Sequence, residues 1–382
     1  MADEDSVRQR VRLLWWSDTY WPYIGGIEGL SAQLVARLVR RGFDVVVVTS
    51  QHSQRMKAHE VHDGADVYRF TFHEALREGQ RERWTGILRE VVRLEKEFKP
   101  DVVHINIPSA TAMFHLLSAK SWRAPIVSAI HGAFPESAGR IDTLMGQVLA
   151  NSAWVTANSE ATLQSALAIA PGFSSRSSVI YNGLEKPSIG DSVFPADSQI
   201  IVCIARLVKN KGIEVALQAF EIVRQRLPNA RMIIAGDGPE YDNLKALAEE
   251  MGLSEAVNFR GWVEPSGIAA LIDEGSQVWV PSLEAESFGN VAVEAMQMGR
   301  PVIVTDQGAL PEVVESEKTG IVIPARDAHA LSNASLRLFA DAAFSQKLGD
   351  AGRERAATLF GIDRHADEYD ALYRRIAAAR TE

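Results

Sequence analysis

Short apolar runs, rich in Val and Ile, alternate along the chain with stretches whose apolar positions recur every three or four residues. The runs predict buried strands and the stretches predict amphipathic helices, and their alternation is typical of βαβ units with parallel sheets. Strands are predicted over 12–17, 44–50, 67–72, 101–107, 125–130, 153–157, 178–181, 200–205, 231–235, 257–260, 277–281, 301–305 and 320–323. Helices are predicted over 28–41, 82–98, 213–226, 240–251, 290–298, 328–339 and 364–379.

A segment rich in Pro, Gly and Ser, residues 186–198, interrupts this alternation and is the best candidate for a linker. A length of 382 residues also favours two domains. We therefore expect an α/β fold of two Rossmann-like, doubly wound domains that face each other across a cleft. The N-terminal domain would cover 1–185, the C-terminal domain 199–363, and a last helix, 364–382, would pack back on the first domain. Ligands of such sheets bind beyond the carboxyl ends of the strands.

Charge and cysteine content narrow the function classes. The formal net charge is −9, and it lies entirely after Glu185, where 20 basic residues face 29 acidic ones. No basic stripe interleaved with aromatic residues is present, which argues against a nucleic-acid partner. The single cysteine, Cys203, lies in an apolar run and is expected to be a buried small hydrophobe. The acidic N-terminus and the short apolar run 13–16 predict a cytoplasmic protein, with peripheral contact to the inner face of the membrane left open.

Two loops that follow predicted strands carry features of a phosphate site. Gly25 and Gly26 precede the first helix, where glycines let backbone N–H groups approach a ligand, although a structural turn explains them equally well. Arg206 and Lys211 follow the first strand of the second half and would suit a diphosphate, unless they are simply solvated. A further loop, 236–240, is best explained by turn and helix-start residues. No G-x-G-x-x-G follows a predicted strand, which disfavours a nicotinamide enzyme.

The most informative loop is 281–299. A strand ends at Pro281, a polar loop containing Gly289 follows, and a helix then begins, so the N–H groups near Asn290 and Val291 form a potential anion site. Glu286 precedes this site and Glu294 follows it. Two carboxylates around an anion site suit a ligand that combines phosphate with hydroxyl donors, as a nucleotide sugar does.

Glu286 and Glu294, with seven residues between them, resemble the E-x7-E signature of the retaining nucleotide-sugar glycosyltransferases of family 4, which have the GT-B fold. The resemblance spans nearly the entire chain. Its other motifs are Gly25 to Glu28, Asp101 to Pro108, Ile130 to Gly132, Val179 to Gly183, Ala205 to Gly212, Gly236 to Pro239 and Thr305 to Glu312.

The resemblance implies a role for each of these residues. Arg206, Lys211 and the amides near Asn290 and Val291 would neutralise the leaving diphosphate. Glu294 would bind the ribose, and Glu286 with the backbone of Phe288 and Gly289 would hold hydroxyls of the donor sugar, with Gly25 and Gly26 in the donor site as well. His131 would lie against the sugar, near its oxocarbenium-like centre. The base would rest near residues 260–263.

Two positions depart from the family pattern. Gln307, Gly308 and Ala309 stand where paired glycines are common, which bears on how this loop packs near the donor. Asn106 stands where a second histidine is frequent, which bears on the choice of acceptor.

The expected reaction is sugar transfer with retained anomeric configuration, by front-face attack of an acceptor hydroxyl, with no cofactor and a UDP- or GDP-sugar as co-substrate. No D-x-D motif lies in a suitable loop, since Asp3 and Asp5 belong to the N-terminal segment, so no metal site is predicted. The alternatives are a GT-B-type sugar-nucleotide epimerase and a catalytically silent nucleotide-binding partner protein. A glycosyl phosphorylase is disfavoured because no lysine is evident for a pyridoxal cofactor.

The acceptor is a glycan, a lipid or a small molecule, and it would bind the N-terminal domain. Residues 77–99 combine Arg and Lys with apolar positions that include Trp84, Ile87 and Val91, a pattern that lipid-acceptor enzymes of the family use at membranes. Interspersed glutamates dilute the positive charge here, which favours an ordinary surface helix.

Overall fold

The computed structural model describes residues 10–23, 25–78, 81–132, 140, 142–187 and 194–380. Asp3, Asp5 and the centre of the predicted linker lie outside these residues. The chain divides into two compact units, of which the first comprises 1–183 with 362–382 and the second comprises 184–361. The chain passes between the units at two places that lie side by side, because the amide of Leu184 donates to the carbonyl of Phe360 (2.8 Å).

The first unit contains an eight-stranded sheet in the order β3-β4-β2-β1-β5-β6-β7-β8. All neighbouring pairs are parallel except β3 and β4. The strands are β1 (Arg12–Ser17), β2 (Asp44–Ser50), β3 (His59–His62), β4 (Ala65–Phe70), β5 (Val102–Asn106), β6 (Ile126–Ile130), β7 (Ser152–Ala157) and β8 (Ser177–Val179). The helices are α1 (Gly26–Arg40), α2 (Phe72–Glu78), α3 (Arg81–Phe98), α4 (Ala112–Ser118), α5 (Leu144–Asn151), α6 (Glu160–Ile169) and α14 (Ile362–Ala378).

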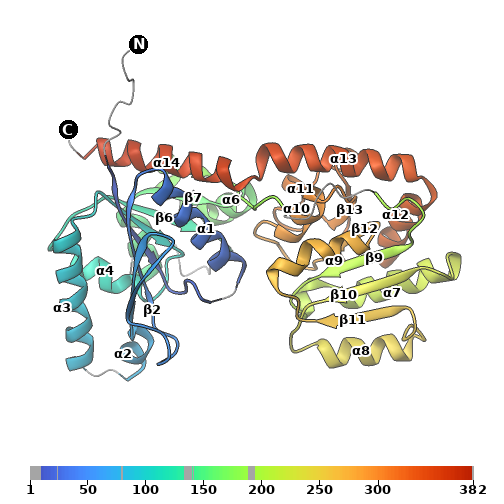
Figure 1. Ribbon diagram of the computed structural model, residues 1–382, viewed down its shortest axis with the longest axis horizontal. Helices are drawn as coiled ribbons and strands as arrows, with labels where there is room; N and C mark the ends of the chain where they lie inside the picture. Colours follow the sequence, from blue (N-terminus) through green and yellow to red (C-terminus); the bar gives the residue numbers. More distant parts are fainter. Residues whose placement is uncertain are drawn as a thin grey trace, which may run out of the picture. The chain divides into compact units, whose positions relative to one another are not determined.

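Helices cover both faces of this sheet, as the continuous apolar strands require. Alternate residues of β1 point to opposite faces. Leu13 and Trp15 pack with α1 and α14, whereas Leu14 and Trp16 pack with α2, α3 and α4. The last helix of the chain thus completes one face of the first unit (Figure 1).

The second unit contains a six-stranded parallel sheet in the order β11-β10-β9-β12-β13-β14. Its strands are β9 (Ile200–Ile204), β10 (Arg231–Ala235), β11 (Val257–Gly261), β12 (Gln277–Val280), β13 (Val302–Thr305) and β14 (Ile321–Ile323). Its helices are α7 (Ile213–Arg226), α8 (Tyr241–Glu250), α9 (Ile268–Glu274), α10 (Asn290–Gln297), α11 (Leu310–Val313), α12 (Ala328–Ala340) and α13 (Ala342–Leu359).

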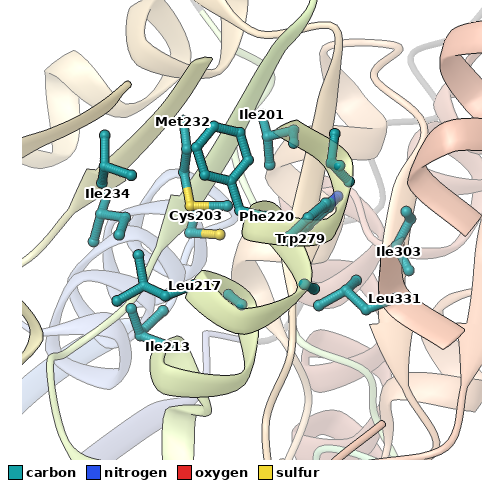
Figure 2. Packing of buried hydrophobic residues seen from close by; sticks show 14 of the residues in the cluster. Ile201, Cys203, Ile213, Leu217, Phe220, Met232, Ile234, Trp279, Ile303 and Leu331 are labelled. Atoms are coloured by element: carbon teal, nitrogen blue, oxygen red, sulfur yellow. The ribbon is translucent and has the colours of Figure 1, made fainter. Parts of the chain in front are cut away.

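The core of the second unit lies between this sheet and helices α7, α8 and α12. Figure 2 shows Phe220 of α7 beside Cys203 and Met232 of the adjacent strands β9 and β10. Cys203 is a free, fully buried thiol, as predicted, and burial raises its pKa to about 12.

All thirteen predicted strands are present, with ends shifted by at most two residues. The prediction over 67–72 was wrong at its end, because β4 stops at Phe70 and Phe72 begins α2, where its buried ring packs on Phe114. Strand β3 was not predicted, because its sequence is polar and only its pairing with β4 keeps it extended. Within the described residues, no helix is long and apolar enough to span a membrane.

Candidate active site

The predicted diphosphate residues lie at the point where the strand order of the second sheet reverses. β9 has β10 on one side and β12 on the other, and the carboxyl ends of such neighbouring strands are where doubly wound sheets bind ligands. The loops after β9 and β12 are in contact, because the Leu283 amide donates to the Asn210 carbonyl (2.8 Å). Gly212 has φ +69° and a Cβ there would lie 2.0 Å from the Pro281 carbonyl oxygen, so only glycine permits this approach.

Two basic side chains in the loop after β9 lie in different environments. Arg206 is exposed, and its guanidinium has no hydrogen bond or ion pair with the described residues. Lys211 forms an ion pair with Glu286, and the side chains are 25% and 15% exposed. The pair fixes one positive charge in a half-buried position, while the forked donors of Arg206 stay available to an anionic ligand.

Glu286 is held through both its side chain and its backbone. The Ser282 hydroxyl donates to Glu286 Oε1 (2.6 Å), and the Ala309 amide donates to the Glu286 carbonyl (2.8 Å). Gly308 pairs with Glu286 and has φ +62°, and a Cβ there would lie 2.2 Å from the Glu286 carbonyl oxygen. Gly308 is therefore the one glycine that this contact requires, and it is present although the loop lacks the paired glycines of the family pattern.

Helix α10 begins directly after Gly289, whose φ is +99°. No side chain caps this end of the helix. The first turn of a helix leaves backbone N–H groups without intrahelical acceptors, and Val291 lies in this turn. Phe288 is buried against Phe360 with ring centroids 5.5 Å apart, so its backbone rather than its ring is the part that a ligand can reach.

Glu294 is the fifth residue of α10 and is half-buried. Among the described residues, none forms a hydrogen bond or ion pair with its carboxylate. Burial raises its pKa from 4.5 to about 7. A desolvated carboxylate without a protein partner is typical of a group that meets its partner in a ligand.

In the first unit, Asn106 and His131 end the adjacent strands β5 and β6. The Ser17 hydroxyl donates to the Thr19 carbonyl (2.7 Å), so it accepts a hydrogen bond from Asn106 Nδ2 (3.2 Å). Asn106 Oδ1 therefore faces His131 Nε2 (2.9 Å), which must carry the proton. His131 Nδ1 is left with a lone pair that has no partner among the described residues. Burial lowers the pKa of His131 to about 4, so the ring is neutral at pH 7.

This chain is similar to known proteins in both of its units. Residues 186–355 match the family model of the glycosyl transferases group 1, and residues 24–186 match that of Glycosyltransferase Family 4. The phosphatidylinositol N-acetylglucosaminyltransferase gpi3 subunit of Schizosaccharomyces pombe is 30% identical over 321 residues, which cover 81% of this chain and 69% of that protein. The chain belongs to glycosyltransferase family 4.

Similarity extends over the whole chain. The glycogen synthase of Mycobacterium tuberculosis is 27% identical, with 97% of this chain and 96% of that protein covered. The structure of a sucrose-phosphate synthase from Thermosynechococcus elongatus has a TM-score of 0.80 at 23% identity, with 97% of this chain and 100% of that chain covered. The protein is therefore a glycosyltransferase with the two Rossmann-like domains of the GT-B fold, and it transfers a sugar from a nucleotide sugar.

The structure brings some of the predicted residues of this glycosyltransferase into contact and assigns others to different units. Lys211 and Glu286 touch, and Arg206, Gly289 and Glu294 lie on the same unit. Gly25, Gly26 and His131 belong to the first unit. A Cβ at Gly25 would lie 2.1 Å from the Glu28 carboxylate, so this glycine makes room for an acidic side chain of its own helix.

Two glycines of the loop after β10 have a structural role. Cβ atoms at Gly236 and Gly238 would lie 1.8 Å and 2.4 Å from the carbonyl oxygens of Ala205 and Leu207, respectively. These glycines let the loop lie against the segment that carries Arg206. The next loop, expected near the base, contains Trp262, which is 58% exposed and follows β11 directly.

Ser282 was missed from the sequence, although it follows Pro281 at the end of β12 in the motif loop. A serine in a polar loop is too common to be informative alone. The role of Asn106 as the partner that fixes the His131 ring was also missed, because it depends on the pairing of β5 with β6.

Proposed function

We propose that the enzyme transfers a sugar, with retained anomeric configuration and without a metal ion at the diphosphate, from UDP- or GDP-sugar to an acceptor hydroxyl. The acceptor would be a glycan, a lipid or a small molecule. The observation that carries this proposal is that the loop after β9, at the strand-order reversal, holds both the unpaired Arg206 guanidinium and Lys211, which pairs with Glu286. This arrangement offers fixed positive charge to a diphosphate and a carboxylate to sugar hydroxyls.

The donor would occupy the second unit along these groups. Arg206, Lys211 and the amides of Asn290 and Val291 bind the diphosphate. Glu294 accepts hydrogen bonds from the ribose hydroxyls. Glu286, with the backbone of Phe288 and Gly289, holds the hydroxyls of the sugar, and Lys211 and Ser282 keep the Glu286 carboxylate in place.

The chemical step follows from this placement of charge. The bond between the anomeric carbon and the diphosphate oxygen breaks, and its electron pair leaves with the nucleoside diphosphate. The acceptor oxygen attacks the same face, and its proton passes to the departing diphosphate. Preorganised donors stabilise negative charge that develops in the transition state, which is the task assigned to Arg206, Lys211 and the helix amides.

His131 would contribute as a neutral ring beside the sugar. Its Nε2–H is occupied by Asn106, so the Nδ1 lone pair is the free polar atom of the ring. A lone pair stabilises an oxocarbenium-like centre, and a protonated imidazole would not. The low pKa of His131 therefore suits this role.

The identity of the acceptor and the cellular location of the enzyme remain predictions. The apolar positions Ile87, Val91 and Leu94 of α3 are buried in the core of the first unit, and Trp84 and Leu88 pack against that core. This favours an ordinary surface helix over a membrane-binding one. Vesicle co-sedimentation at low salt tests the peripheral contact, and a cytoplasmic location is expected from the sequence alone.

A thermal-shift screen with UDP, GDP, ADP and their common sugars tests the proposal. A ligand at about 100 times its Kd stabilises a protein by about 2.7 kcal/mol, so UDP or GDP should raise Tm by several degrees. Arg206→Ala should remove this shift, whereas Lys209→Ala, at a neighbouring exposed lysine, should keep it. A shift that survives both Arg206→Ala and Lys211→Ala contradicts the diphosphate assignment. NMR of the product then establishes whether the anomeric configuration of the donor is retained.

A further inference from the structure

Three potential metal ligands meet at the carboxyl edge of the first sheet, outside the donor residues. Asp18 follows β1, His52 follows β2, and His73 lies in the first turn of α2 after β4. These three strands are adjacent in the sheet order. One ligand atom from each residue lies within 4.8 Å of the others.

Hydrogen bonds hold the side chains of His52 and Asp18 in place. His52 Nε2 lies 3.1 Å from the Asp18 carbonyl oxygen, which only accepts, so the ring donates from Nε2 and keeps a lone pair on Nδ1. Metal-bound histidines usually donate their second ring N–H in this way. The Ser50 hydroxyl donates to Asp18 Oδ1 (2.7 Å) and fixes the carboxylate.

The separation between His73 and Asp18 also suits a small divalent ion. His73 Nε2 lies 3.0 Å from Asp18 Oδ1, close to the separation of about 3.3 Å between two ligand atoms of a tetrahedral zinc ion. The rings of His52 and His73 lie side by side, with centroids 5.4 Å apart. An isolated His–Asp hydrogen bond accounts for His73 and Asp18, but it does not involve His52.

We propose that Asp18, His52 and His73 bind a divalent transition-metal ion, with Zn²⁺ as the best match. Two imidazoles and one carboxylate are ligands that zinc accepts, and three protein ligands leave one position open to water or a substrate oxygen. Solvent reaches the cluster, since His52 is exposed and the other two side chains are 31% and 41% exposed. The ion would tie the loop after β1 to β2 and α2, next to the exposed ring of Tyr23, whose centroid lies 5.4 Å from that of His52.

The three residues of this site belong to the first unit, whereas the diphosphate residues belong to the second. Metal binding here and metal-independent donor cleavage are therefore compatible. Donor cleavage would proceed after the metal has been removed. Binding of the metal would be measured separately, without an activity assay.

The test uses the full-length protein without a polyhistidine tag, stripped with EDTA and dialysed into metal-free buffer. Titration calorimetry with Zn²⁺ should give one site per chain, and Co²⁺ should give the visible absorption of a bound ion. His52→Ala and His73→Ala should each weaken Zn²⁺ binding at least tenfold. His59→Ala is the matched control, since His59 is an exposed histidine of the same sheet that pairs with Asp66.

Circular dichroism shows whether the variants fold. Of the two ligand substitutions, His52→Ala should disturb the fold less, because His52 is exposed. Absence of Zn²⁺ binding to the wild type would overturn the proposal. So would equal affinity in the wild type and in the His52→Ala and His73→Ala variants, or the same loss in His59→Ala, because these results indicate adventitious binding to surface histidines.

Discussion

Asn106 Oδ1 accepts a hydrogen bond from His131 Nε2 at 2.9 Å, and this contact fixes which ring nitrogen of His131 carries the proton. The residue that departs from the family pattern is thus the partner of the histidine expected beside the sugar. Its own orientation is fixed by Ser17 and Ser31, which accept from Nδ2 at 3.2 Å and 2.9 Å.

Asn106→Leu removes this acceptor and should lower kcat about tenfold or more, since general positioning effects at reacting centres have this size. The His131 ring would lose its fixed tautomer, which ¹⁵N NMR of the histidine side chains detects as a change from the Nε2–H form. Ser31→Ala removes only one acceptor of the Asn106 amide and serves as the control. An unchanged kcat and tautomer in Asn106→Leu would show that the contact has no role in the reaction.

Glu294 makes stability depend on pH in a predictable direction. Its folded-state pKa of about 7 exceeds the unfolded value of 4.5, so the ligand-free protein loses stability as pH rises from about 4.5 through 7. Glu294→Gln removes this loss and should raise Tm by a few degrees at pH 8, but not at pH 4.5. The same variant should bind UDP or GDP more weakly, because it loses the charged acceptor for the ribose. A Tm below that of the wild type at pH 8 would contradict the unpaired state of this carboxylate.

A substitution at Gly308 tests the close contact between this residue and the Glu286 backbone. Gly308→Ala should destabilise the enzyme by about 3 kcal/mol or more, because the backbone is left-handed and the new Cβ meets the Glu286 carbonyl. Gly252→Ala is a matched control with φ +68° and open space around the new Cβ, and it should cost only about 1–2 kcal/mol. Urea unfolding measures both. Equal losses would mean that backbone conformation alone requires glycine at 308.

Trp262 is the exposed aromatic residue of the loop expected near the base. Stacking of a base on an aromatic ring contributes about 1–3 kcal/mol, so Trp262→Ala should weaken nucleotide binding about fivefold to a hundredfold. Trp21→Ala, at an exposed tryptophan of the first unit, should leave the affinity unchanged. Titration calorimetry with UDP and GDP compares them. Full affinity in Trp262→Ala would place the base elsewhere.

Much of the fold could be predicted because most parallel strands are short runs of mainly apolar residues, such as 44–50, which are typical of strands buried on both faces. Strand β3 and helix α2 could not, because a polar edge strand and the boundary after Phe70 depend on their neighbours. In the proposed donor site, Arg206, Lys211, Glu286 and Glu294 lie in two motifs whose spacing is visible in the sequence. The Asp18, His52 and His73 cluster is not visible, since its residues follow three strands that only the sheet order makes adjacent.

The roles of the glycines likewise depend on neighbours that the sequence does not reveal. Gly25 stands in a motif that suggested a ligand loop, and a Cβ there would lie close to the Glu28 carboxylate, which accepts from the Thr19 hydroxyl (2.5 Å). The sequence identifies where a glycine is needed, whereas the atom that approaches it is known only from the folded chain.

Release of nucleoside diphosphate from a nucleotide sugar, measured by ion-exchange chromatography in the presence of EDTA, tests the central claim most directly. The account predicts release of UDP or GDP by the wild type and by Lys209→Ala, and a rate lower by about a hundredfold or more in Arg206→Ala, the usual effect of removing one preorganised donor. Release that requires a divalent metal, or that proceeds at an unchanged rate in Arg206→Ala, would contradict it.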